Sequence, residues 1–234
     1  ENNRFTFFQG RFSNQGDDET MNLGFGQRTL LRSNTILVGG NLFYDYQFKD
    51  KHIRWGFGAD FLTSVGDMHA NFYEAQSGAK NKIVGANTIS EQALGGYDFE
   101  LGFPIPYLPS FKVYAKAFEW DSVNGIGDLE GEVYSLKGNL PYGMTIEFGK
   151  TSYNRIAQDQ EFINLTINLF VLGNNKNKGF KDEMSSLLSV TPFNIALTDM
   201  TIRRFEKVRR ENKIIKQATV TAGLRAGTVQ VLGY

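Results

Sequence analysis

The feature that most constrains the fold of this 234-residue chain is an alternation of apolar and polar residues with a period of two. Successive side chains of a β-strand point to opposite faces of its sheet, so this period predicts strands with one apolar and one polar face. The clearest segment, residues 53–61, carries on one face Ile53, Trp55, Phe57, Ala59 and Phe61. Its other face carries Arg54, Gly56, Gly58 and Asp60. Segments 97–105, 142–149 and 163–169 follow the same rule.

The charges on the glycine-rich face predict which face points inward. Placing Arg54 and Asp60 against lipid hydrocarbon would be costly, whereas a hydrated lumen accepts them. The alternation therefore predicts an all-β fold, an antiparallel up-and-down transmembrane β-barrel with the aromatic face toward lipid. A soluble lipocalin-like barrel or a β-sandwich also alternates, but it buries its apolar face and exposes charge. That soluble alternative stays open at this point.

Less regular segments raise the expected number of strands to about ten. They span 4–12, 20–31, 35–48, 67–76, 110–120 and 129–138. Segment 110–120 carries aromatic residues on both faces, so its orientation is left open. Consecutive strands without helix-length connections favour an antiparallel meander.

The connections between these segments supply a second test, because outer-membrane barrels have short turns at one end and longer loops at the other. The first, fifth, seventh and ninth connections are long, and the fifth, residues 77–92, is expected to be a surface loop. The second, fourth and eighth are short. The third, 49–51, is shorter than this rule requires and the sixth, 104–109, is longer. Aromatic residues expected near strand ends, as an interfacial girdle, are Trp55, Trp120, Tyr97, Tyr107 and Tyr142.

Composition excludes several classes of function. The 25 basic and 25 acidic residues cancel, so no global field favours a nucleic-acid partner. There is no cysteine, and no apolar run reaches the roughly 18 residues of a membrane-spanning helix. His52 and His69, the only histidines, have no serine or carboxylate partner at the spacing of a catalytic or metal site. We therefore expect no enzyme activity, no metal and no cofactor. Glu1 opens the chain without a starting methionine, which suggests a fragment or a mature form.

The pattern changes in the segment 181–217, where Met184, Leu187 and Leu188 fall at helical spacing. A strongly basic run follows, and its expected contacts with the rest of the chain are Arg203, Arg204, Arg209, Arg210 and Asn212. The alternation predicts inward-facing acidic residues at Asp45, Asp60, Asp98, Glu100 and Glu147. Opposite charges attract more strongly in a lumen of low effective dielectric than in bulk water. We therefore expect this C-terminal segment to thread the barrel.

Several motifs resemble the β-domain of the intimins and invasins, the inverse autotransporters. They are MNLGFGQR at 21–28, GGNLFYDYQF at 39–48, RWGFGADF at 54–61 and GGYDFELGFPIPYLPSFKVYAKAFEWD at 95–121. VRRENKIIKQ at 208–217 is similar to the arginine- and asparagine-rich stretch that follows the barrel in that family. The motifs occur in the family's order over most of the chain, which is more specific than any one of them.

The resemblance implies an outer-membrane translocator that exports and displays a C-terminal adhesin passenger. It implies three regions: a barrel over 1–173, a linker over 174–207 whose short helix plugs the pore, and an extended strand over 208–234 leading to a passenger beyond the chain. The implied partners are the outer-membrane bilayer, the passenger and the barrel-assembly machinery, and the implied location is the bacterial outer membrane. The family's barrel has twelve strands, so about ten strands here leave one hairpin unaccounted for. A passive porin-like channel and a soluble β-barrel binding module remain the alternatives.

Overall fold

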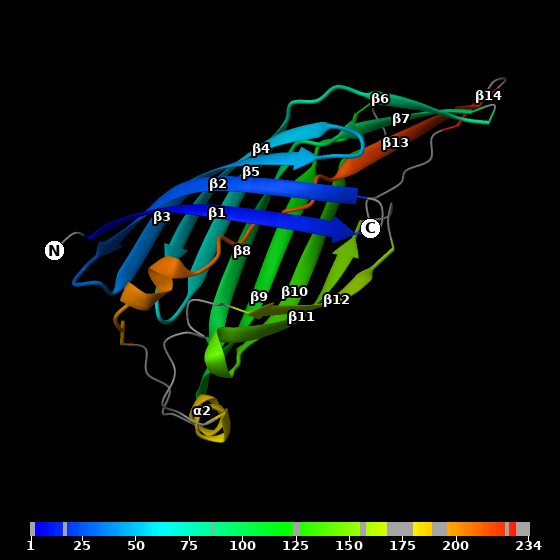
Figure 1. Ribbon diagram of the computed structural model, residues 1–234. Coiled ribbons are helices and arrows are strands. Elements are labelled where there is room, and N and C mark those ends of the chain that lie inside the picture. The colour runs from blue at the N-terminus through cyan, green and yellow to red at the C-terminus, as the bar shows by residue number, and fades with distance from the viewer. Residues whose placement is uncertain are drawn as a thin grey trace.

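A computed structural model describes residues 3–15, 18–85, 87–123, 127–154, 158–167, 180–188, 196–222 and 225–227. Within these residues the chain is an all-β protein with very little helix, and ten of its strands form one antiparallel sheet (Figure 1). Their order is β1 (Arg4–Gln15), β2 (Asp18–Leu31), β3 (Ile36–Gln47), β4 (His52–Leu62), β5 (Asp67–Ala75), β8 (Gly96–Ile105), β9 (Leu108–Trp120), β10 (Leu129–Asn139), β11 (Met144–Tyr153) and β12 (Gln160–Ile167).

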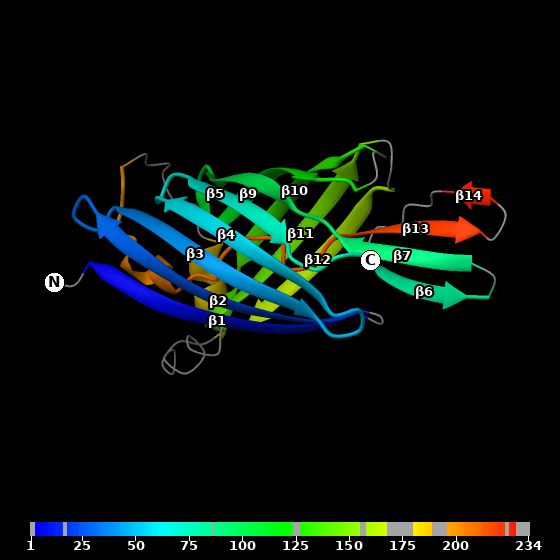
Figure 2. The same ribbon diagram turned by 90° about the horizontal axis from the view of Figure 1, so that it is seen from above.

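The sheet is a meander that curves around a concave inner face (Figures 1 and 2). Each strand pairs with the next along the chain, except that β5 pairs with β8. The predicted antiparallel all-β fold is confirmed. β1 and β12 form the two edges, and no pairing joins them among the described residues, so the sheet is open.

The period of two separates the two faces of the sheet as predicted. On β4, Phe57 is 50% exposed, whereas Arg54 and Asp60 on the other face of the same strand are buried. Large apolar side chains cover the outer face on most strands, among them Phe8, Phe12, Leu23, Phe25, Leu42, Phe61, Met68, Phe72, Phe99, Phe103, Val113, Leu136, Phe148, Ile163 and Leu165. Soluble monomers rarely expose an apolar patch beyond a few hundred Å². This outer face is therefore suited to an apolar surrounding.

Strand β9, whose orientation the sequence left open, places its even-numbered residues inward. Tyr114, Phe118 and Trp120 are buried on the inner face. The prediction that Trp120 belongs to an outer aromatic girdle is wrong, because its ring lies 5.1 Å from that of Tyr73 and within 5.7 Å of the Arg54 guanidinium. Because β9 carries aromatic residues on both faces, its sequence alone does not indicate which face points inward.

Strand register aligns the inner-facing residues in rows that cross the sheet. The row nearest the β2–β3 turn runs through Leu30, Leu37, Leu62, Asp67, Gly102 and Tyr114. The next row runs through Arg28, Gly39, Asp60, His69, Glu100 and Lys116. A third runs through Gly26, Asn41, Gly58, Asn71, Asp98 and Phe118, and a row near the other end contains Asn22, Asp45, Arg54 and Ala75. Charged and amide side chains far apart in sequence thus become neighbours.

The connections divide the sheet into two different ends. Residues 32–35, 63–66 and 106–107, together with the 3-10 turn η1 (Pro141–Gly143), make the short-turn end. The sixth connection is therefore short, because β8 and β9 extend to Ile105 and Leu108 and the prediction of a longer loop is wrong. The first connection is also shorter than predicted, since β1 and β2 extend to Gln15 and Asp18.

At the opposite end, the predicted surface loop 77–92 forms a hairpin instead. Strands β6 (Lys80–Val84) and β7 (Asn87–Ala93) pair with each other and project beyond the main sheet (Figure 1). They belong to a four-stranded sheet with β13 (Lys216–Ala222) and β14 (Arg225–Gly227), in the order β14-β13-β7-β6. The distant strand β13 therefore pairs with this hairpin through β7. We call this the hairpin end.

The helical spacing near residue 184 corresponds to α2 (Phe180–Leu187), which contacts η1 at the short-turn end. A second helical turn, η2 (Thr201–Phe205), follows. Among the described residues, no helix is both long and apolar enough to cross a membrane. That a helix of the linker plugs a pore stays a prediction.

Inner-facing glycines make room for rings from neighbouring strands. A Cβ atom on Gly24 would lie 2.2 Å from the Phe43 ring, and one on Gly102 would lie 2.3 Å from the Tyr114 ring. Glycine therefore allows the large side chains of β3 and β9 to lie flat against the inner face.

We expect Gly24→Ala to destabilise the fold by about 1–3 kcal/mol, because the added methyl group must displace Phe43. Gly40→Ala is the control, since a Cβ there meets its nearest neighbour at 3.9 Å. The measurement is the free energy of unfolding from urea titrations in lipid vesicles. Equal stability of the two variants would contradict the close approach.

Candidate functional site on the inner face of the sheet

Residues 196–222, here called the tail, run along the inner face from the short-turn end to the hairpin end (Figure 1). At the short-turn end, Met200 is 1% exposed and packs against Leu30, Leu37 and Leu62. Its backbone N–H donates to the Asn34 carbonyl at 2.8 Å. At the hairpin end the tail becomes β13, which pairs with β7. The two ends fix the direction of the tail relative to the sheet.

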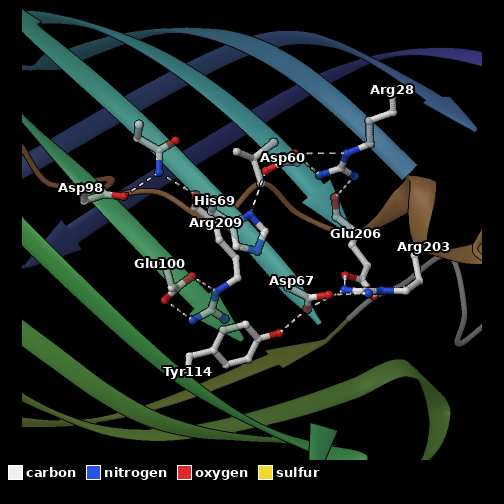
Figure 3. A network of polar contacts seen from close by, with 12 residues as sticks. Arg28, Asp60, Asp67, His69, Asp98, Glu100, Tyr114, Arg203, Glu206 and Arg209 are labelled. Carbon is white, nitrogen blue, oxygen red and sulfur yellow. Dashed lines mark hydrogen bonds and ion pairs between the residues drawn. The ribbon is translucent and has the colours of Figure 1, made fainter. Parts of the chain in front are cut away.

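The first ionic contact centres on Arg203 and Asp67 (Figure 3). The guanidinium donates to both carboxylate oxygens at 2.7 and 2.9 Å, and it also binds Glu206. Asp67 has no exposed side-chain surface, and it accepts further hydrogen bonds from Lys112 and from the Tyr114 hydroxyl. Two parallel N–H···O bonds fix the orientation of the guanidinium relative to the carboxylate, in addition to pairing their charges.

The second contact joins Arg209 to two inner-face carboxylates. Arg209 Nη2 donates to Glu100 and to Glu147 at 2.8 Å each, and its Nε also donates to Glu100. The guanidinium lies 3.7 Å from the centre of the Tyr114 ring, which supports a cation–π contact (Figure 3). One arginine therefore connects β8, β9 and β11.

The third contact is the most deeply buried. Arg210 donates to both oxygens of Asp45 at 2.8 and 2.6 Å, and Arg54 donates to the same carboxylate at 2.8 Å. All three side chains are at most 1% exposed. The absence of a side chain at Gly56 allows Arg210 to approach, since a Cβ there would lie 2.7 Å from its Nη2.

The inner face also binds the backbone of the tail. Arg28 Nη1 donates to the carbonyls of residues 204 and 206 at 3.0 and 2.5 Å. Asn71 donates to the carbonyl of residue 209 at 3.1 Å, Arg54 to that of residue 211 at 2.8 Å, and Asn22 to that of residue 212 at 2.9 Å. These contacts do not involve the tail's side chains.

A cluster of charges surrounds the tail where it leaves the sheet. We call Asp18, Asp50, Lys82, Glu91 and Lys216 the exit cluster. Lys216 lies 3.0 Å from Asp18 and 3.7 Å from Asp50, and Lys82 lies 2.6 Å from Asp50 and 3.1 Å from Glu91. Burial raises the pKa of Asp50, but the hydrogen bond from Lys82 and the charges of Lys82 and Lys216 outweigh it and lower that pKa below 3.8. Asp50 therefore stays ionised at neutral pH.

The structure brings three of the five expected inner acids to the tail's arginines: Asp45 meets Arg210, and Glu100 and Glu147 meet Arg209. Asp60 and Asp98 instead bind inner-face side chains. Arg203 meets Asp67, which the sequence reasoning did not single out, although it lies on the polar face of the segment 67–76.

The other two expected tail contacts differ from simple ion pairs. The Arg204 guanidinium lies over the rings of Phe5 and Phe205 at 5.8 and 5.0 Å, and no ion pair of its side chain occurs in the described part of the chain. Asn212 contributes its backbone carbonyl to Asn22. The sequence reasoning placed Arg54 inward but did not name it as a donor to the tail, and it missed the donors Arg28, Asn22 and Asn71, which the alternation alone could have placed inward.

Each histidine has a polar neighbour in the fold that its spacing in the sequence did not indicate. His69 Nδ1 lies 2.8 Å from Asp60, and His52 Nδ1 lies 2.9 Å from the Ser77 hydroxyl. Strand pairing creates the first contact and the turn into the β6–β7 hairpin the second, so spacing in the sequence could not show them. Among the described residues no group of acidic or histidine side chains is arranged to hold a metal ion.

An apolar outer face, a polar inner face and a C-terminal segment bound along that inner face define a β-domain that holds part of its own chain. Residues 1–212 match the family model "Inverse autotransporter, beta-domain". The chain belongs to this family, which confirms the predicted membership. Membership implies a location in the bacterial outer membrane and supports a translocator role.

A solved structure from work described as "Unveiling the Mechanism Behind the in-meso Crystallization of Membrane Proteins" is similar in fold. The TM-score is 0.68 at 18% sequence identity, and the similarity covers 93% of this chain and 88% of that one. At this identity the likeness concerns the fold alone. No curated protein matches the chain significantly in sequence.

We expect Arg210→Gln to loosen the tail, because it leaves Asp45 and Arg54 without a buried partner. Breaking a buried ion pair costs about 3–5 kcal/mol, so local opening should rise about a hundredfold or more. Hydrogen–deuterium exchange of peptides covering residues 200–215 measures it. Arg204→Gln removes the same charge without breaking a described ion pair and should change exchange little. Equal exchange in both variants would contradict the role of the Asp45 contact.

We expect Lys216→Met to free the β6–β7 hairpin, because it leaves Asp18, Asp50 and Glu91 with Lys82 as their remaining cation in the exit cluster. Limited proteolysis at residues 80–84 measures this, and Lys213→Met removes a nearby positive charge as the control.

Because the pKa of Asp50 is lowered, the contribution of its carboxylate to stability is present above the unfolded pKa of 3.8 and is lost as pH falls through the folded pKa. In the unsubstituted chain, hairpin protection should therefore persist from neutral pH down to about pH 4. Loss of protection at mildly acidic pH would contradict this assignment.

Proposed function

We propose that this chain is the translocator and anchor domain of an inverse autotransporter adhesin. In this proposal, residues 1–173 form an outer-membrane β-barrel, 174–207 a linker whose short helix plugs the pore, and 208–234 an extended strand leading to a C-terminal passenger for cell adhesion. The partners are the outer-membrane bilayer, the passenger and the barrel-assembly machinery. No enzymatic step belongs to the proposal.

The observation that carries the proposal is the path of the basic tail along the acidic inner face. The tail passes from the short-turn end to the hairpin end. In bacterial outer-membrane barrels, short turns are periplasmic and longer loops are extracellular. The tail therefore runs outward, and whatever follows residue 222 begins on the cell surface.

The outer face supports a membrane setting for this path. Phe57, Phe99 and Phe103 are each 41–51% exposed on the central strands β4 and β8. Polar side chains of the same strands, such as Asp60 and Asp98, lie on the inner face. A sheet arranged in this way is stable with lipid outside and a polar interior, and it would be unstable with the faces reversed.

Closure of the sheet is compatible with the strand directions. In an up-and-down meander of ten strands the first and last run antiparallel, so β1 and β12 have the orientation that direct pairing requires. Insertion of one hairpin between them, as in the twelve-stranded barrels of the family, preserves the same alternation.

The test uses the full chain with an epitope tag after Tyr234, produced with a secretion signal in a Gram-negative host. We expect antibody to reach the tag on intact cells and the purified protein to require detergent and to show heat-modifiable gel migration. In planar bilayers, Arg209→Glu/Arg210→Glu should raise conductance, because the new carboxylates face Glu100, Glu147 and Asp45 and expel the tail.

Three outcomes would overturn the proposal in different ways. A chain that conducts equally with and without the charge reversal is a passive channel. A tag that stays inside cells whose outer membrane contains the folded protein excludes export. A protein that is soluble without detergent is a soluble binding module.

A further inference from the structure

The tail is held by two kinds of contact that differ in what they recognise. Arg203, Arg209 and Arg210 bind through their side chains, so these contacts depend on the tail's sequence. The contacts to the carbonyls of residues 204, 206, 209, 211 and 212 depend only on the backbone. Four inner-face side chains supply all five of these hydrogen bonds.

Each of these four donors is held by an inner-face carboxylate. Arg28 binds Asp60 at 2.9 Å, and Arg54 binds Asp45 at 2.8 Å. Asn22 Nδ2 donates to Asp45 at 2.7 Å and Asn71 Nδ2 to Asp98 at 2.7 Å. An amide nitrogen has two hydrogens, so each asparagine can give one to its aspartate and one to the tail. The same arrangement, in which a carboxylate holds a donor that binds a tail carbonyl, thus recurs along the inner face.

We propose that Asn71, Arg54 and Asn22 form a binding site for the backbone of an extended polypeptide of any sequence, with Arg28 at its entrance, where it binds carbonyls at the end of the turn η2. We call it the backbone site. The inference rests on the proposed export function and names its substrate class: every segment of the passenger that passes through, and not only the resting tail. Asp60 and Asp98 are positioning residues, because they contact donors of the site and no side chain of the tail in the described part of the chain.

The physical reason is the hydrogen-bonding demand of an extended chain. An extended segment does not pair its own carbonyls, and in water the solvent satisfies them. Entry into a confined lumen removes part of that water, and an unpaired carbonyl then raises the free energy of the passing chain. Fixed donors replace the lost water without reference to sequence. Removing a donor should therefore slow passage.

Asn41 provides a matched control for this site. It lies in the same row of the inner face as Asn71, separated from it by Gly58. Its Nδ2 is buried and has no hydrogen-bond partner in the structure, so it does not bind the resting tail. Asn41→Ala removes the same side chain from the same level of the sheet as Asn71→Ala.

The experiment uses two unrelated unstructured passengers, each fused after Tyr234 and carrying an epitope tag. After pulse labelling, it measures how fast each passenger becomes accessible to protease on intact cells. We expect Asn71→Ala and Asn22→Ala each to slow emergence about fivefold, equally for both passengers, which corresponds to the loss of one hydrogen bond. Asn41→Ala should leave the rate within about twofold, because no bond is lost. Heat-modifiable migration establishes that all variants contain the same folded fraction.

The outcomes separate this inference from the function on which it rests. Unchanged or faster emergence in both donor variants, slowing of only one passenger, or equal slowing by Asn41→Ala would overturn the backbone site while leaving export intact. If neither tag reaches the surface from the unsubstituted chain, export itself fails and the backbone site fails with it. If Asn71→Ala does not fold, Asn22→Ala on β2 decides.

Discussion

A charge that is removed from water needs a partner, and this requirement governs the arrangement of the inner face. Asp45 is fully buried and is stable there because Arg54, Arg210 and Asn22 together occupy its oxygens. Taking one partner away from such a group leaves an uncompensated buried charge, which costs more than the intact pair contributes. Two of the three partners belong to the sheet and one to the tail, so neither part is satisfied by itself. The folded sheet and its bound segment are therefore one thermodynamic unit.

The two kinds of tail contact differ in whether they depend on the tail's sequence. The guanidinium groups of Arg203, Arg209 and Arg210 meet Asp67, Glu100 with Glu147, and Asp45 at the same time. A shift of the tail by even one residue would break all of these pairs, so together they define a single resting position. The carbonyl contacts impose no such requirement, because every residue offers the same acceptor. The proposed export, in which many sequences pass and one segment stays bound, would require both kinds of contact.

The period of two allowed much of this to be predicted from the sequence, because one alternation fixes both the strands and the face of each charge. It indicated the ten strands and placed Asp45 and Glu100 among the inner acids. It did not predict that Asp60 binds Arg28 and His69, because those contacts depend on which strands pair and in which register. The β6–β7 hairpin was missed for a related reason: its neighbour β13 lies more than a hundred residues further along the chain. Trp120 was misplaced because β9 carries aromatic residues on both faces, and only contact with Arg54 and Tyr73 distinguishes them.

Contacts at both ends of the tail oppose its movement along the inner face. Met200 precedes the arginines, so for a chain moving from the short-turn end to the hairpin end it enters last. It packs among Leu30, Leu37 and Leu62, an apolar cluster at the short-turn end of the inner face. Movement of the tail toward the hairpin end would separate the Met200 side chain from these leucines and place it beside the charged rows of the inner face. At the other end, β13 is already bound to β7 through backbone hydrogen bonds and to the exit cluster through Lys216. Apolar burial of Met200 at one end and strand pairing at the other therefore hold a segment whose middle is bound by ion pairs, hydrogen bonds and aromatic contacts.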